Sequence, residues 1–502
     1  MDRKSKRLFA LFAILPFLAA IVAGEQAQKS FGGDSNSVPK SWDADGFASF
    51  DVPLADSKTA VRHASAADYY SIPLRKIYKT YPIYAPGREP AGYIAWLKQQ
   101  EPELVFDPSR MKTQDDWIKA GELIFDAPIT YNSLSTVAEL NDHEWYKKMA
   151  MPVTREGIMP FFRYVVRKTG QVDVGEFSCG MCHSRVMPDG SAIKGAQGNM
   201  PFDRLLAYGF RKRADLEAVR RVARILFAAP WVRSNPDSQL ERMSLDQIAS
   251  VHEAIPPGAI SRFGTSPFYP PQVPDLIGVK DRRYLDHTGL MRHRTVEDLM
   301  RYSAINQGGD VLDRFGDFTP LGTYPDPRNL ARYSDENLFA LVMYLYSLKP
   351  PPNPNKFGPL AERGHKIFIR EGCVMCHTPP LYTNNKLTPV EGFEAAEDHA
   401  KKLDIMPIIV GTDSNLALNT RRGTGYYKVP SLKGVWYRGP FEHNGSVATL
   451  EDWLSPRRTR DDYNPASLRR LATTTGAVKG HPFGLDLRED DRNALVAFLK
   501  TL

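Results

Sequence analysis

The chain has 502 residues, 25% of them charged and 42% hydrophobic, which is the composition of a globular protein with room for two or three domains. The formal net charge is +7, with 65 Lys and Arg against 58 Asp and Glu. This basic excess is spread along the chain, and no Lys/Arg-rich run with interleaved aromatic residues follows the first ten positions. We therefore expect no nucleic-acid partner.

The N-terminus has the pattern of a secretory signal. A basic segment at 2–7 precedes an apolar run at 8–23, which is shorter than the ~20 residues that a membrane-spanning helix needs. The alternative is an uncleaved membrane anchor. We predict a signal peptide over 1–27, a periplasmic or secreted protein, and no membrane association once the signal is removed.

The next segment, 28–110, is predicted to be an N-terminal extension. Its first part, 28–66, is polar and rich in Ser, Asp and Gly, which predicts a loose leader. Little of the whole chain shows the alternation of a half-buried strand, so the expected fold is mainly α with long loops. Helical patterns recur at 93–100, 117–125, 206–227 and 240–254.

All four cysteines of the chain lie in two CxxCH motifs. In such a motif two thiols about one helical turn apart bond to the vinyl groups of one haem, and the adjacent histidine binds the iron. A thioredoxin-like pair or half a zinc site is the alternative, but no spare cysteine remains to complete either pattern. We predict two covalently bound haem c groups, held by Cys179, Cys182 and His183 and by Cys373, Cys376 and His377.

A diverged internal repeat contains these motifs. Residues 273–279 (VPDLIGV) match 429–435 (VPSLKGV), and His287 and His443 follow at the same distance, each in a His-x-Gly sequence. This equivalence predicts a shared structural role, such as a hydrogen bond to a haem propionate. Axial ligation by His443 is the alternative.

Each half also ends in an amphipathic helix, at 337–348 and 493–502, and the proline-rich run at 350–354 separates the halves. We predict an N-terminal cytochrome c domain over 111–350 and a C-terminal cytochrome c domain over 351–502.

The halves begin alike as well, on similar segments at Gly121 and Gly364. The second CxxCH motif follows Gly364 closely, whereas the first follows Gly121 only after a long stretch. The N-terminal domain is therefore predicted to carry a large insertion.

Function depends on the sixth ligand of each iron, because two strong axial ligands favour electron transfer and an open position allows O2 or peroxide to bind. His481 lies in a Gly- and Pro-fixed loop at 479–484, whereas the equivalent run at 324–329 has no His or Met. We predict that His481 closes the C-terminal haem and that the N-terminal haem stays open. A surface role for His481, or a ligand from Met406, is the alternative. Three further histidines are expected to be solvated: His293, His365 and His399.

The repeat, its His-x-Gly signal and the terminal helices resemble the di-haem cytochrome c peroxidase family, which includes the MauG enzymes. The resemblance covers roughly 121–502. Within this superfamily the chain is most similar to the rubber-oxygenase branch, at 298–302, 307–310, 432–438, 450–453 and 480–484. That branch implies a reactive N-terminal haem and a bis-histidine C-terminal haem.

The chain departs from the family pattern at two places. Where peroxidases supply a methionine ligand to the C-terminal haem, this chain has Arg457. Peroxidases also place a tryptophan between the haems, but no Trp occurs between Trp231 and Trp436, and Tyr284 and His287 occupy that region.

The resemblance implies that the segment at 304–307 lines the distal face of the first haem. Ala304, Ile305 and Gln307 are therefore the candidates for the catalytic pocket. No glutamate stands where peroxidases use one for O–O cleavage, although Asp310 is a nearby substitute. An apolar pocket suits O2 better than acid–base-assisted cleavage of peroxide.

Together these features predict a haem-dependent oxidoreductase. The N-terminal haem reacts with peroxide or O2, and the C-terminal haem relays electrons from a redox partner protein or a small-molecule reductant. The alternatives are a pure electron-transfer cytochrome with two closed haems and a haem-based sensor. Peroxidase and oxygenase activity are left open, as is a bound Ca2+ ion.

Overall fold

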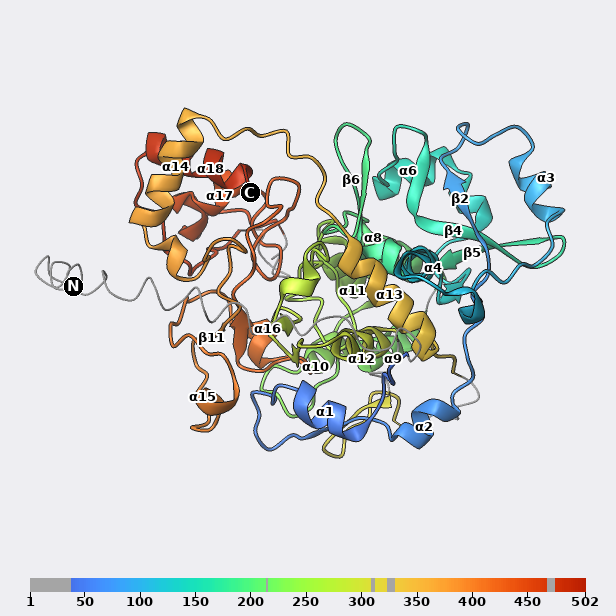
Figure 1. Ribbon diagram of the computed structural model, residues 1–502, viewed down its shortest axis with the longest axis horizontal. Helices are drawn as coiled ribbons and strands as arrows, with labels where there is room; N and C mark the ends of the chain where they lie inside the picture. The colour runs from blue at the N-terminus through green and yellow to red at the C-terminus, as the bar shows by residue number, and fades with distance from the viewer. Residues whose placement is uncertain (1–37, 214, 308–311, 323–329, 467–474) are drawn as a thin grey trace, which may run out of the picture. The chain divides into compact units, whose positions relative to one another are not determined.

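Figure 1 shows the computed structural model, which describes residues 38–213, 215–307, 312–322, 330–466 and 475–502. The predicted signal peptide at 1–27 lies outside the described residues. Helices hold more of the described chain than strands do, so the expected mainly α fold is confirmed. Among the described helices, none is both long and apolar enough to cross a lipid bilayer.

The helices expected from the sequence are present. The stretch predicted at 206–227 is two helices, because Asp215 caps a new helix by accepting a hydrogen bond from the Ala218 amide. The expected helices are α3 (Tyr93–Lys98), α4 (Gln114–Asp126), α8 (Phe202–Arg213), α9 (Leu216–Phe227), α11 (Leu245–Glu253), α13 (Asp335–Ser347) and α18 (Glu489–Lys500). The others are α1 (Ala44–Phe50), α2 (Ala66–Ser71), α5 (Val137–Leu140), α6 (His143–Met149), α7 (Cys179–Cys182), α10 (Pro236–Leu240), α12 (Val296–Asn306), α14 (Pro359–Arg370), α15 (His399–Lys402), α16 (Asn415–Leu418) and α17 (Leu450–Trp453).

Two helix pairs repeat the same packing. Helix α4 packs on α13, and α14 packs on α18. In each pair a glycine of the first helix lies against a backbone carbonyl of the second, Gly121 against Ala340 and Gly364 against Ala494, with no room for a Cβ atom. The two glycines that mark the start of each half in the sequence are therefore close-contact positions of equivalent helix pairs.

A four-stranded antiparallel sheet is built from segments between α2 and α7 in the sequence, and the sequence did not predict it. Its order is β2 (Thr80–Tyr84), β4 (Ile158–Lys168), β5 (Gln171–Glu176) and β3 (Thr130–Tyr131). The sequence pattern missed this sheet because β4 has buried residues on both faces and so lacks a two-residue alternation. The remaining strands form short pairs: β1 (Val61–Arg62) with β10 (Arg314–Phe315), β6 (Ser184–Val186) with β7 (Ala192–Lys194), β8 (Tyr284–Leu285) with β9 (Met291–Arg292), and β11 (Leu387–Pro389) with β12 (Tyr426–Lys428).

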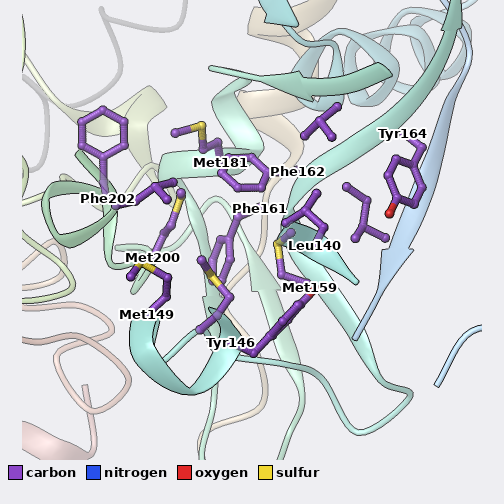
Figure 2. Close-up of a cluster of buried hydrophobic side chains, with 14 of the residues drawn as sticks. Leu140, Tyr146, Met149, Met159, Phe161, Phe162, Tyr164, Met181, Met200 and Phe202 are labelled. Atoms are coloured by element: carbon purple, nitrogen blue, oxygen red, sulfur yellow. The ribbon is translucent and has the colours of Figure 1, made fainter. Parts of the chain in front are cut away.

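The sheet contributes to a core that reaches the first CxxCH motif. Phe161 and Phe162 of β4 are buried in one cluster with Met181, the third residue of the motif (Figure 2). Met181 is fully buried, and its sulfur accepts a hydrogen bond from the Phe177 amide at 3.0 Å. The insertion in the N-terminal half thus supports the backbone that carries Cys179 and Cys182.

The predicted loose leader at 28–66 is wrong from residue 40 onward, while 28–37 lie outside the described residues. Trp42 is buried and stacks on Tyr69 with 4.1 Å between the ring centroids. Asp43, which caps α1, forms an ion pair with Arg301 of α12 at 2.7 Å. The few apolar residues of this polar segment are the ones that pack, so its average composition did not indicate that the segment is folded.

Candidate functional site

The second CxxCH motif opens onto a cavity that we call the main cavity. Cys373 and Cys376 lie on a short 3-10 turn that follows α14, and both line this cavity of about 220 Å³. His377 and His481 line it as well. Their side chains come from opposite ends of the C-terminal half, so the fold brings together the two histidines that the sequence assigns to one iron.

The His377 ring is held by backbone carbonyls. Its Nδ1 lies 3.2 Å from the carbonyl oxygens of Tyr382 and Pro430. A carbonyl only accepts hydrogen bonds, so Nδ1 carries the proton and Nε2 keeps a lone pair that can bind a metal ion. Burial lowers the pKa of His377 to about 4, which keeps the imidazole neutral at pH 7.

His183 repeats this arrangement in the first motif. Its Nδ1 lies 3.0 Å from the carbonyl oxygen of Pro274, and burial lowers its pKa to about 4. Pro274 and Pro430 are equivalent positions in the two VPxLxGV segments. Their carbonyls orient both proximal histidines, a role that sequence reasoning missed although the repeated Val-Pro was its signal.

His481 faces His377 across the cavity. The two ring centroids are 6.4 Å apart, and His481 Nδ1 is buried without a hydrogen-bond partner in the described chain. Two metal–nitrogen bonds of about 2 Å each, together with the two ring radii, span a similar distance. The donor set of two thiols, one free Nε2 and one facing imidazole therefore fits a haem c with two histidine ligands.

Arg458 fixes the loop that carries His481. Its guanidinium is fully buried and donates to the carbonyls of Gly480 and His481, each at 2.9 Å. It also donates to the carbonyls of Trp453 at 2.8 Å and Val478 at 2.7 Å. The neighbour of the position at which peroxidases carry a methionine ligand is thus the residue that holds a histidine loop in place.

His287 and His443 both lie beside the main cavity, but their contacts differ. His287 Nε2 lies 2.7 Å from the carbonyl oxygen of Gln272, and burial lowers its pKa to about 3. His443 Nδ1 lies 2.6 Å from Glu442 Oε1, and its ring stacks on Tyr427 at 3.9 Å. The two histidines do not share a set of hydrogen-bond partners, and their common structural role stays a prediction.

The first motif has different surroundings. Gln307, at the end of α12, donates from Nε2 to the Cys179 sulfur at 3.3 Å, while its Oε1 is buried without a partner in the described chain. Ala304 and Ile305 are buried in the preceding turn of α12. Of the three predicted pocket residues, Gln307 is the one with a recorded contact to the motif. Asp310 and the run at 324–329 lie outside the described residues.

The surroundings of the motif thiols disfavour the thiolate form. Burial, followed by the charge of Cys182, raises the pKa of Cys179 to about 12, and burial raises the pKa of Cys373 to about 11. A thioredoxin-like pair needs a lowered thiol pKa. Thiols with a raised pKa beside a histidine with a free Nε2 therefore favour haem attachment over thiol–disulfide exchange.

Two of the three histidines expected to be solvated are buried. His293 lies 2.8 Å from the Arg282 carbonyl oxygen and 2.7 Å from the Tyr346 hydroxyl. His399 lies 3.0 Å from the Tyr426 hydroxyl. Both rings are buried and contact tyrosine hydroxyls, so that expectation was wrong for both, whereas His365 is half-buried.

Met406 and Ca2+ were the remaining open ligands. Met406 lies close to the second motif, with its sulfur 3.5 Å from Cys376 Sγ. Within the described ranges, no group of three or more His, Cys, Asp and Glu side chains is arranged to hold a metal ion. Bound Ca2+ stays a prediction.

Comparisons with known proteins identify relatives of this chain. A family model described as RoxA-like, cytochrome c-like matches residues 425–464. The cytochrome-c peroxidase IdrP1 of Denitromonas iodatirespirans is 28% identical over 160 residues, covering 28% of this chain and 40% of the relative. The methylamine utilization protein MauG of Paracoccus denitrificans (strain Pd 1222) is 30% identical over 177 residues, covering 29% of this chain and 43% of the relative.

These matches span less than half the length of either curated relative. Among solved structures, the hydrazine synthase of Kuenenia stuttgartiensis aligns with 58% of this chain and 88% of its own at 16% identity. Its TM-score of 0.30 is too low to carry an argument about the fold.

Proposed function

This chain is a relative of the cytochrome c peroxidases and MauG with a RoxA-like cytochrome c segment, and from that premise we propose that it is an exported two-haem oxidoreductase. The first motif holds the haem that reacts with peroxide or O2, and the second holds the haem that relays electrons. The paired imidazoles of His377 and His481 carry this proposal, because a closed coordination shell at one motif assigns the chemistry to the other.

Haem c at each motif would supply a redox-active iron, whose coordination number decides between electron transfer and ligand binding. The chain's own residues do the rest. The carbonyls of Pro274 and Pro430 fix the tautomer and orientation of His183 and His377. The loop held by Arg458 presents His481 to the second site and so excludes external ligands there.

At the first motif, Gln307 supports reaction with O2 more than with peroxide. Its amide can orient a ligand by hydrogen bonding, but it neither takes nor gives a proton. Heterolysis of peroxide gains typically 10²–10⁴-fold from a general acid–base group, and Gln307 is not one. The proposed substrate class is therefore O2 together with an oxidisable organic compound, with peroxide turnover as the second candidate.

Electron paramagnetic resonance and optical spectra of the isolated holoprotein test the proposal. We expect two haems per chain, one low-spin with two histidine ligands and one high-spin, and one CO bound per chain after reduction. Two low-spin haems that do not react with CO, O2 or peroxide would indicate a pure electron-transfer protein and contradict the proposal.

Two steady-state assays then separate the substrate classes. One supplies peroxide with a reduced cytochrome, and the other supplies O2 with an unsaturated hydrocarbon. Faster turnover in the second assay is the expected result, and turnover confined to the first would make the protein a peroxidase.

A further inference from the structure

A second, smaller cavity of about 50 Å³ adjoins the main one. His287, Lys428 and Arg438 line both cavities and so form a wall that the two cavities share. The cysteines of the second motif line the main cavity but not the smaller one. The shared wall is therefore a part of the haem site that the predicted ligands do not account for.

This shared wall carries two basic side chains, Lys428 and Arg438. Lys428 Nζ has one recorded hydrogen bond, a long one of 3.4 Å to the Tyr284 carbonyl oxygen. Arg438 donates to two carbonyls from one terminal nitrogen, and its Nε is buried without a partner in the described chain. Arg282, which lines the smaller cavity, donates to the Ile277 carbonyl oxygen. None of the three cations has a recorded ion pair among the described residues.

Two carboxyl groups act on these cations without a direct ion pair: Asp275, which lines the smaller cavity, acts on Arg282 and Arg438, and Asp286 acts on Lys428. Asp275 accepts hydrogen bonds from the Tyr437 hydroxyl at 2.9 Å and from the Ile277 amide at 3.2 Å, and burial raises its pKa. Burial, together with the charges of Arg282 and its neighbours, lowers the pKa of Lys428 to about 7. An unpaired cation in such a place is costly unless an anion joins it.

We propose that Lys428 and Arg438, backed by Arg282, bind the propionate carboxylates of the haem held by the second motif, an inference that rests on the proposed function. The propionates extend from the edge of the macrocycle remote from the vinyl groups, so attachment at Cys373 and Cys376 directs them away from the cysteines. The smaller cavity includes neither cysteine, which fits a place for the propionates beside the shared wall.

From the sequence, His287 and His443 are the expected propionate partners, whereas here the propionates are assigned to Lys428 and Arg438. His287 Nε2 already donates to the Gln272 carbonyl. His443 Nδ1 lies 2.6 Å from Glu442 Oε1, and its Nε2 is buried without a hydrogen-bond partner in the described chain. Lys and Arg donate to carboxylates in charge-assisted bonds that are about twice as strong as neutral ones.

The test replaces Lys428 by Gln and compares it with Lys433→Gln, which removes the same charge from an exposed position of the same segment. The readouts are the midpoint potential of the low-spin haem and its propionate bending band in resonance Raman spectra. Because a nearby cation favours the reduced iron, K428Q should lower the potential and shift the band. K433Q should do neither, and Lys428→Arg should restore both.

Three outcomes contradict the inference. The first is that K428Q has the same midpoint potential and propionate band as K433Q. The second is that K428R has the same values as K428Q. A potential that depends on inorganic phosphate concentration in the unmodified protein but not in K428Q would assign the site to a free anion instead. Haem content and spin states are measured on the same samples. If haem content and spin states are unchanged in K428Q and its midpoint potential is unchanged as well, this inference alone is refuted. If the unmodified protein shows no bis-histidine signal, the proposed function is refuted.

Discussion

The two CxxCH motifs share one side of their surroundings and differ on the other. In both, the histidine donates from Nδ1 to a proline carbonyl of the repeated VPxLxGV segment. Opposite that side, the second motif faces His481, whereas the first has Gln307 beside its leading cysteine. The duplicated scaffold therefore fixes the proximal ligands, and segments outside the repeat make the motifs unequal.

The third residue of each motif differs in the same way. Met181 is fully buried against the sheet of the N-terminal half, while Met375 is 55% exposed. The insertion thus encloses the first motif and has no counterpart at the second. An enclosed site suits chemistry, and a partly open one suits electron exchange with a partner.

The largest expected effect comes from removing the ligand that makes the motifs unequal. His481→Ala should open the second haem, so that the low-spin bis-histidine signal disappears and the reduced protein binds two CO per chain instead of one. His365→Ala, at a half-buried position outside the main cavity, is the matched control. An unchanged CO stoichiometry in H481A would show that another residue closes that haem.

Much of this asymmetry was predictable because it resides in side chains with a chemical signature. The motifs, the terminal helices and the Gly- and Pro-fixed loop of His481 are visible as residue types at fixed spacings. The proline carbonyls are not, because a backbone oxygen leaves no trace in side-chain chemistry. The role of Arg458 could not be predicted for the same reason, since its four hydrogen-bond partners are also backbone carbonyls.

Burial was harder to predict than chemistry. His293 and His399 have charged neighbours in sequence, but the tyrosines that bury and bond them, Tyr346 and Tyr426, come from distant segments. Strand β4 was missed because a strand covered on both faces has a continuous apolar pattern, which periodicity cannot distinguish from a helix.

The next effect is on the loop that presents His481. Arg458→Met should lower the free energy of unfolding by about 4 kcal/mol, because four buried carbonyls lose their donor. It should also give the second haem partial CO binding. Denaturant unfolding and CO titration measure both, with the exposed neighbour Arg457→Met as control. Full stability with a loose His481 would mean that water replaces the guanidinium.

The two methionines test the difference in enclosure. Met181→Ala removes a fully buried side chain, and we expect a loss of about 3 kcal/mol in unfolding free energy. Met375→Ala should change the unfolding free energy by less than about 0.5 kcal/mol, because that side chain is mostly exposed. Equal losses in the two variants would contradict the view that the third residue of the motif is enclosed at the first motif and exposed at the second.

The smallest effect concerns the chemistry assigned to the first motif. Gln307→Leu removes the amide that donates to the Cys179 sulfur, and we expect the reaction of the first haem with O2 to slow about threefold, the size of one neutral hydrogen bond. Gln307→Glu keeps the shape and adds a group that can move protons, so its reaction with peroxide should accelerate at least tenfold. Stopped-flow spectra follow both rates, and the spectrum of the second haem serves as the internal control. Gln307 contacts the first motif through Cys179, so a substitution there should affect the first haem. If either variant changed the reaction of the second haem and left the first haem unaffected, the assignment of chemistry to the first motif would be wrong.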